Sequence, residues 1–244
     1  MFPYRDDNPT LGTPVITMFL IGANVAVWVL IQGMGSNPEL ARSVCELGLI
    51  PAEYLGRVSA GTTVPLGPGT TCVLGIERHW YTPLTSMFLH GGWFHLIGNM
   101  WFLWLFGNNV EDSMGHVRYL VFYLLCGVAA AAMQTAVSPA SIVPMVGASG
   151  AISGVMGAYV VLYPRVRVHM LVVLFVFITR IVVPAYVMLG YWFLLQLLGG
   201  SMAQGEGGVA FWAHVGGFVA GAVLISMFKD RELVREHRAL AQYV

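Results

Sequence analysis

Gly147-Ala148-Ser149-Gly150-Ala151-Ile152-Ser153-Gly154 opens a long apolar stretch, and a second apolar stretch downstream carries a single histidine, His214. A polar side chain inside a segment long enough to cross a membrane is costly to bury, so by default it marks a functional site. A serine among small residues, together with one embedded histidine, indicates a nucleophile and its base. These residues predict an enzyme that works inside a membrane.

The composition independently predicts a membrane protein. Of the 244 residues, 57% are hydrophobic and 10% are charged, and the mean hydropathy is +0.72. A soluble domain carries about 25% charged residues. The formal net charge is +0, which indicates neither nucleic acid nor a strongly charged partner. We expect no cleavable signal peptide, and one membrane domain over 1–228 followed by a charged cytoplasmic tail over 229–244.

Apolar runs of about 20 residues, enough to cross roughly 30 Å of hydrocarbon, recur along the chain. Only helices and closed barrels satisfy their backbones in lipid, and these runs lack period-2 alternation, so we predict an all-α bundle. The first part of 166–199, before Arg180, has the length of a re-entrant or interfacial segment. The sequence predicts six transmembrane helices, at about 14–33, 93–110, 117–137, 149–163, 183–199 and 208–228, with an outer loop over 34–92.

The placement of Lys and Arg predicts the orientation. With the N-terminus in the cytoplasm, nine of these residues lie inside and only Arg42, Arg57 and Arg78 lie outside. We therefore expect both termini in the cytoplasm. Ser149 and His214 then lie at similar depth, near the outer ends of the fourth and sixth segments.

Small residues surround both the serine and the histidine. They are Gly147, Gly150, Gly154 and Ala158 in the fourth segment, and Ala213, Gly217 and Gly221 in the sixth. Such faces allow helices to approach closely, so packing them together would bring His214 to Ser149. A helix beginning at Ser149 would also aim free N–H groups and its positive dipole end at a developing oxyanion. A plain packing stripe and a structural histidine are the competing interpretations.

His90, His95 and Asn99 form a further cluster at the outer end of the second segment. His95 and Asn99 are four residues apart and share one helix face, and both side chains can donate to an oxyanion. A metal site of His90, His95 and His214 is disfavoured, because no carboxylate or cysteine lies at matching depth. The other histidines are expected to be solvated: His79, His116, His169 and His237.

Three motifs together resemble the rhomboid family of intramembrane serine proteases. They are H-G-G-x-x-H-x-x-x-N at 90–99, G-A-S-G-A-I-x-G at 147–154 and A-H-x-G-G-F-x-x-G at 213–221, in the family's order and on the expected helices. The turn Glu111-Asp112-x-x-Gly115 is similar to that family as well.

The resemblance implies a catalytic dyad of Ser149 and His214, without an acid. It implies an oxyanion hole of Asn99, His95 and the Ser149 backbone N–H, with His90 supporting the start of the second helix. It further implies cleavage of transmembrane segments of other proteins near a small residue, with no metal or organic cofactor. We expect a multi-pass protein of a bacterial inner membrane, and predict no oligomeric state.

Two features of the sequence leave questions to the tertiary structure. Ser153 stands four residues after the serine, where the family often has an aromatic that packs on the base, so Trp212 or an aromatic of the second segment is expected to substitute. The bulky stretch Tyr191–Leu194 is either a gate for substrate helices or ordinary lipid-facing surface, with neither favoured.

Two other classes of function compete with proteolysis. An inactive relative that binds transmembrane helices without cutting them is disfavoured by the intact Ser149, His214 and Asn99. A transporter or channel is disfavoured because the spans carry no buried charge pair and no duplicated half.

Cys45 and Cys72 lie in the same outer loop, where the compartment lets disulfides persist, so we predict that they pair. Cys126 lies in the third apolar segment and is expected to be a buried packing residue.

Overall fold

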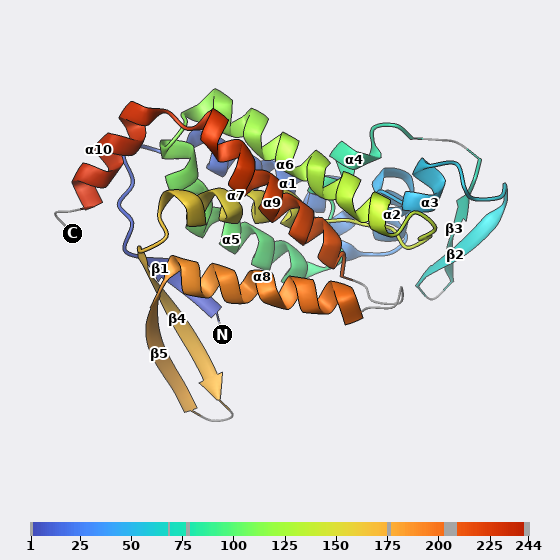
Figure 1. The fold of residues 1–244 in the computed structure, drawn as a ribbon. Coiled ribbons are helices and arrows are strands. Elements are labelled where there is room, and N and C mark those ends of the chain that lie inside the picture. Colours follow the sequence, from blue (N-terminus) through green and yellow to red (C-terminus); the bar gives the residue numbers. More distant parts are fainter. Residues whose placement is uncertain (1, 68, 77–78, 175–176, 203–208, 242–244) are drawn as a thin grey trace.

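The computed structural model describes residues 2–67, 69–76, 79–174, 177–202 and 209–241, so Arg78 of the charge count lies outside the described residues. Long helices lie side by side in its body (Figure 1) and coincide with the six apolar segments of the sequence. They are α1 Val15–Leu30, α5 Trp93–Asp112, α6 His116–Val137, α7 Ser149–Leu162, α8 Ala185–Met202 and α9 Phe211–Phe228.

Shorter elements cover the two ends of this bundle (Figure 1). At one end lie η1 Gly33–Gly35, α2 Glu39–Leu47, α3 Pro51–Tyr54, β2 Thr62–Gly67, β3 Thr70–Leu74, α4 Thr82–Thr85 and η2 Ser86–Phe88. At the other lie β1 Phe2–Asp6, β4 Arg167–Leu174, β5 Phe177–Pro184 and α10 Arg231–Ala241.

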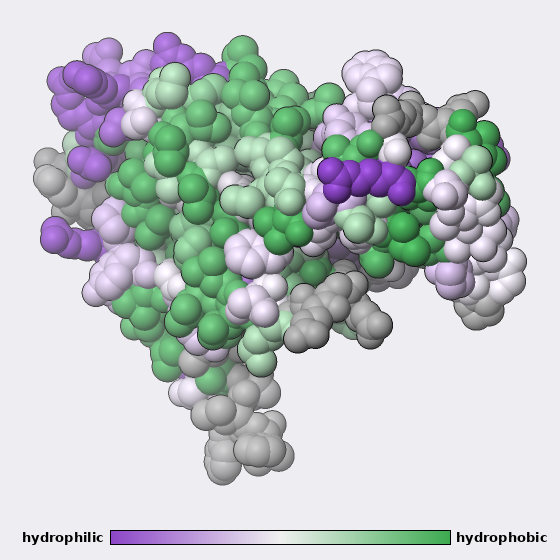
Figure 2. Space-filling view, turned by 45° about the vertical axis from the view of Figure 1, so that its right-hand side comes forward, coloured by the Kyte–Doolittle hydropathy of each residue, from purple (hydrophilic) through white to green (hydrophobic). Residues whose placement is uncertain are grey.

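The helical body presents the surface that a bilayer requires. Helices α6, α8 and α9 are long and apolar enough to cross a membrane, and α1 and α7 are shorter apolar helices. Figure 2 shows a broad hydrophobic surface over the body, with most strongly hydrophilic residues at the end that carries α10. This distribution matches helices whose apolar side chains face lipid.

Helix α7 occupies the centre of the bundle. Ten of its 14 residues are buried, including Tyr159 at 0% exposure, and a helix that is apolar all round belongs in a core. Its neighbours are α5, α6 and α9. Ser149, the first residue of α7, is therefore held by helices on several sides.

The carboxylate of Glu111 ties the end of α5 to the start of α1. It is 1% exposed and accepts hydrogen bonds from the backbone N–H groups of Ile16 and Thr17, both at 2.8 Å, and from the Thr17 hydroxyl at 2.7 Å. The first N–H groups of a helix have no partner within the helix, and a negative charge there is favourable. The Glu111 turn noticed in the sequence thus caps a helix about 95 residues away.

The prediction of an all-α chain is wrong for the segment between α7 and α8. Strands β4 and β5 pair antiparallel from Arg167–Pro184 to Leu174–Phe177, and β1 extends them into a three-stranded sheet in the order β1-β4-β5. The part before Arg180, expected as a re-entrant or interfacial segment, therefore belongs to a β-hairpin. Its β-branched residues suit a strand, and pairing satisfies the backbone at the end of the bundle without a helix.

The N-terminal strand also fastens this end to the core. The Tyr159 hydroxyl of α7 donates a hydrogen bond to the carboxylate of Asp6, and burial raises the pKa of Asp6 to about 6. Asp7 pairs with Arg167 at 3.1 Å and with His169 at 2.8 Å. Polar contacts from Asp6 at the end of β1 and from Asp7 directly after it thus hold the sheet to α7 and to itself.

The loop between α1 and α5 is ordered by a hairpin and a disulfide. Strands β2 and β3 pair antiparallel, and Cys45 of α2 is bonded to Cys72 of β3 with their Cα atoms 5.5 Å apart. Cys72 lies in a small core with Ile50, Val64 and Leu74, separate from the main one. Cys126 is buried between the helices, as expected.

Candidate active site

The backbone before Ser149 is shaped by glycine and held by the outer loop. Gly147 has φ +127°, and a Cβ there would lie 2.7 Å from Nε2 of His95, so only glycine fits this conformation and this space. The Gly147 N–H donates to the Ser86 carbonyl at 2.9 Å, and Met145 pairs with Leu49. The chain enters α7 in an irregular conformation, and the helix starts at the serine.

Helices α7 and α9 approach so closely that their backbones nearly touch. A Cβ on Gly217 would lie 2.0 Å from the Gly150 carbonyl oxygen, and a Cβ on Gly221 would lie 1.9 Å from that of Gly154. Small residues at four-residue spacing are what such a contact needs. The two small-residue faces seen in the sequence therefore pack against each other.

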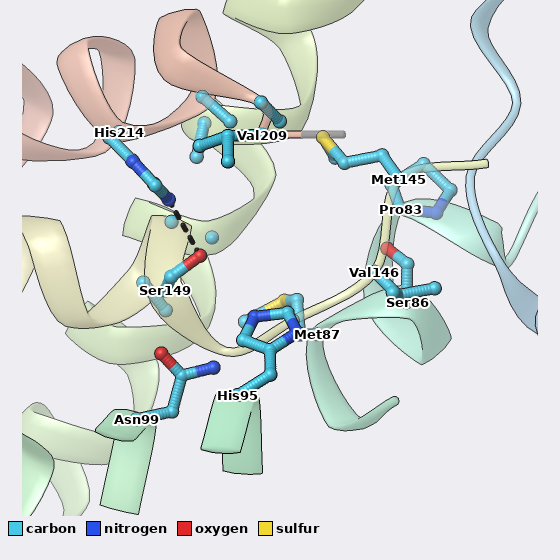
Figure 3. A pocket seen from close by; sticks show the side chains of 17 residues that line it. Pro83, Ser86, Met87, His95, Asn99, Met145, Val146, Ser149, Val209 and His214 are labelled. Atoms are coloured by element: carbon cyan, nitrogen blue, oxygen red, sulfur yellow. Dashed lines mark hydrogen bonds between the residues drawn. The ribbon is translucent and has the colours of Figure 1, made fainter. Parts of the chain in front are cut away.

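This close contact brings the serine and the histidine together. The distance from Ser149 Oγ to His214 Nε2 is 2.8 Å (Figure 3), within hydrogen-bond reach of a nucleophile and its base. The pair lines a cavity of about 280 Å³ together with His95 and Asn99. An adjoining cavity of about 720 Å³ shares His95 and Met145 with it.

Asn99 presents an unused donor to this cavity. Its side chain is 9% exposed, and among the described residues its Nδ2 has no hydrogen-bond partner. In Figure 3 the side chains of Asn99 and His95 lie on the same side of the cavity, next to Ser149. A buried donor without a partner is costly, and the cavity beside Ser149 is where an accepting atom could meet it.

His90 lies next to His95, and its backbone is hydrogen-bonded to Gln32, which follows the end of α1. Its backbone N–H donates to Gln32 Oε1 at 2.8 Å, and its carbonyl accepts from Gln32 Nε2 at 2.9 Å. The His90 ring is fully buried, and its centroid lies 5.1 Å from that of His95. His90 therefore sits just before α5, where it contacts a residue of the cavity.

The aromatic that packs on His214 comes from a helix that the sequence reasoning did not consider. Trp192 of α8 has its ring centroid 5.8 Å from that of His214, whereas Trp212 lies near Gly200. The expectation of Trp212 or a second-segment aromatic is wrong, because α8 packs along α9 on the side of the histidine. The Ser153 hydroxyl donates to the Ser149 carbonyl at 2.6 Å and stays within its own helix.

Gln196 is a site residue that the sequence reasoning missed. Its Oε1 lies 2.8 Å from Nδ1 of His214. The available signal was a lone amide inside the apolar run 185–202, because a polar residue at membrane depth indicates a functional position by default. Nothing in the sequence showed that it would face His214.

The four residues Tyr191–Leu194, considered as a gate, face two directions: two pack toward α9 and two are exposed. Trp192 and Phe193 pack toward α9, where Phe193 stacks on Phe218 with centroids 4.6 Å apart. Tyr191 and Leu194 are each 51% exposed. A gate in this stretch stays a prediction.

His237 was expected to be solvated, and this was wrong. It is fully buried between α10 and the bundle, where its ring lies 4.7 Å from that of Tyr163 and its Nε2 lies 3.4 Å from the Asn109 amide. Burial lowers the pKa of His237. The charged tail contains the helix α10, and His237 lies with Val234 on the face of this helix that is buried against the bundle.

Comparison with known proteins identifies the family. The sequence profile of the Rhomboid domain matches residues 77–231, more than half of the chain. Rhomboid protease GluP of Bacillus subtilis is 31% identical over 168 residues, which cover 68% of this chain and 29% of that protein. RHOMBOID-like protein 6, mitochondrial, of Arabidopsis thaliana is 30% identical over 163 residues, covering 61% of this chain and 52% of that protein.

A shorter and more similar match comes from a plastid protein. Rhomboid-like protein 11, chloroplastic, of Arabidopsis thaliana is 41% identical over 75 residues, covering 31% of this chain and 26% of that protein. The aligned segments thus span from 26% to 52% of the lengths of these relatives.

The apolar helices and the family match define an integral membrane protein, mostly helical, with a serine and a histidine paired at an internal cavity. The chain belongs to the rhomboid family. The resemblance found in the sequence motifs is thereby confirmed.

Proposed function

We propose that this protein is an intramembrane serine endopeptidase that cleaves transmembrane segments of other membrane proteins. The observation that carries the proposal is the 2.8 Å contact between Ser149 Oγ and His214 Nε2 beside a cavity. Relatives named as proteases, such as GluP of Bacillus subtilis, support the same class of reaction. An inactive helix-binding protein is not favoured, because such a protein has no need of the paired serine and histidine.

The reaction begins with attack of Ser149 Oγ on a peptide carbonyl carbon. His214 Nε2 accepts the serine proton and then gives it to the leaving amine, which leaves an acyl-enzyme. Water, deprotonated by the same nitrogen, hydrolyses the acyl-enzyme and frees Ser149. These reaction steps use Ser149, His214 and water, and they require neither a metal nor an organic cofactor.

The negative oxygen of each tetrahedral intermediate lies on the side of Asn99 and His95. The donors are the Asn99 Nδ2, which has no partner among the described residues, the His95 ring and the Ser149 N–H at the start of α7. Donors held in place before reaction need no reorganisation when the charge develops. His90 supports this arrangement because its ring packs against that of His95, and Gly147 supports it because a side chain there would collide with the His95 ring.

The proposal includes six membrane crossings, formed by α1, α5, α6, α7, α8 and α9, with both termini in the cytoplasm. Its support is the excess of Lys and Arg at the end that carries α10 and β1. The disulfide lies at the opposite end, in keeping with an oxidising exterior. We place the protein in a bacterial cell membrane, in keeping with its match to GluP of Bacillus subtilis.

The test is cleavage of a model transmembrane substrate by purified protein in liposomes. Ser149→Ala and His214→Ala should each abolish cleavage, and the double variant should be no worse, because the two residues act as a unit. Ser226→Ala is the matched control, since this exposed α9 serine bonds only to the Val223 carbonyl. If the Ser149→Ala protein still cleaved the substrate, Ser149 could not be the nucleophile and the proposed mechanism would be wrong.

Asn99→Ala tests the oxyanion hole separately. We expect the turnover number to fall by about 10²- to 10³-fold, the effect of losing one such donor. A change confined to KM, with turnover unchanged, would exclude Asn99 from stabilising the transition state.

A further inference from the structure

Gln196 completes a chain of side chains that runs from the nucleophile to a third helix. Ser149 of α7 contacts His214 of α9 through Nε2, and the opposite ring nitrogen, Nδ1, contacts Gln196 Oε1 of α8. Both contacts are 2.8 Å long. We propose that Gln196 is a positioning residue that fixes the tautomer and the ring orientation of His214. This inference rests on the proposed function of Ser149 and His214.

A second contact of the Gln196 amide decides which way it points. Its Nε2 donates to the Trp192 carbonyl at 3.4 Å, one helical turn earlier. A carbonyl oxygen can only accept, so this side of the amide must be the NH₂ group. The oxygen then faces His214, and Nδ1 of His214 must carry the proton that Oε1 accepts.

The tautomer follows directly. A neutral imidazole has one N–H, so a proton on Nδ1 leaves Nε2 with the lone pair that receives the Ser149 proton. In the opposite tautomer Nε2 would donate to Ser149 and could not act as a base. Gln196 thus supplies the orienting acceptor that a two-residue dyad lacks.

Because Gln196 belongs to α8, the orientation of the His214 ring depends on where α8 lies relative to α9. From residue 190 to residue 202, Gln196 is the one buried residue of α8, whereas Ala185, Met188 and Leu189 are buried in its first half. Trp192 lies against both His214 and Phe218 on the same side. Displacement of this half of α8 from α9 would remove both the acceptor and the ring that packs on the imidazole.

Two substitutions separate orientation from packing. Gln196→Leu keeps a side chain of similar size but removes the acceptor, and Gln196→Glu keeps an acceptor. We expect Gln196→Leu to lower the turnover number roughly 10- to 100-fold, the range for one lost buried hydrogen bond. Gln196→Glu should recover most of this loss, and Ser226→Ala should match the wild type.

The pH dependence of the turnover number distinguishes orientation of His214 from packing, because a change in packing alone would not shift it. A carboxylate at 196 would stabilise the imidazolium of His214, so the acidic limb of the turnover profile should move to higher pH in Gln196→Glu. Among the residues that the structure describes, His95 is the other titratable side chain that lines this cavity, besides the serine and histidine themselves. It is unchanged in every variant, so a shift is attributable to position 196.

The tautomer itself can be read without any cleavage. In protein labelled with ¹⁵N-histidine, the His214 resonances should show hydrogen on Nδ1 in wild-type and Ser149→Ala protein, and a mixture of tautomers in Gln196→Leu. Gln196→Met, which also lacks a strong acceptor, replaces the leucine variant if that fails to fold.

The proposal is overturned if Gln196→Leu keeps the wild-type turnover, pH profile and ¹⁵N shifts. Failure of the proposed function looks different, because then either the wild type would cleave no substrate or Ser149→Ala would cleave as well as the wild type. In that case the ¹⁵N shifts would still decide whether Gln196 orients the ring.

Discussion

The substitution Gly217→Ala tests whether the close contact between α7 and α9 sets the distance between Ser149 and His214. The new Cβ would lie 2.0 Å from the Gly150 carbonyl oxygen, whereas ordinary contact begins at 3.4 Å. The difference requires the two backbones to separate by about 1.4 Å (3.4 − 2.0). If half of that separation falls along the line from Ser149 Oγ to His214 Nε2, this hydrogen bond lengthens from 2.8 Å to about 3.5 Å. At that length it is no longer a useful hydrogen bond.

The expected effect on activity is much larger than the effect on folding. A catalytic group misplaced by about 1 Å costs on the order of 100-fold in rate, and overpacking costs about 1–3 kcal/mol of stability. For a chain of this size, each kcal/mol lowers Tm by roughly 2–4 °C. We therefore expect Gly217→Ala to be folded, somewhat less stable, and at least about 100-fold slower.

The assay measures kcat on a transmembrane substrate in liposomes, together with Tm of the same preparation. Gly22→Ala on α1 is the matched control, because nothing lies within 4 Å of its added Cβ, and it should keep both values. A Gly217→Ala protein with wild-type kcat and Tm would refute the reasoning, since the two backbones could not then be in contact at that point.

Three other perturbations test the supports of the fold. Because burial raises the pKa of Asp6 to about 6, its neutral carboxyl favours the folded state below about pH 4, and this stability, at most about 3 kcal/mol, is lost as the pH rises through 6. Asp6→Asn should therefore gain Tm relative to the wild type between pH 4.5 and 7.5, and a constant difference would contradict this. Glu111→Ala leaves the N–H groups of Ile16 and Thr17 unpaired, so Tm should drop by the equivalent of about 3 kcal/mol; an unchanged Tm would show that α1 needs no such cap. Cys72→Ser should cost roughly 3 kcal/mol by opening the loop that Cys45 and Cys72 close, and mass spectrometry that finds both thiols free in the wild type would exclude the disulfide.

Hydropathy alone located the long helices, because lipid imposes a length and an apolar composition on any segment that crosses it. The predicted segment 149–163 and the helix Ser149–Leu162 differ by one residue at the end. The small residues around Ser149 and His214 indicated a close helix contact before any coordinates, because few other sequences permit one. These signals are local, and each can be read within a single segment.

The strands and the orienting partners of His214 were decided by the tertiary structure. The segment 167–184 folds back on itself as the antiparallel strands β4 and β5, and β1, more than 160 residues away, extends this hairpin into a three-stranded sheet. Gln196 lies 18 residues before His214 and Ser149 lies 65 residues before it, on different helices. The rotation of α8 about its axis decides whether Gln196 or a neighbour faces the imidazole. Helical periodicity is uninformative about that rotation when apolar residues surround the helix on every side, so packing against α9 sets it.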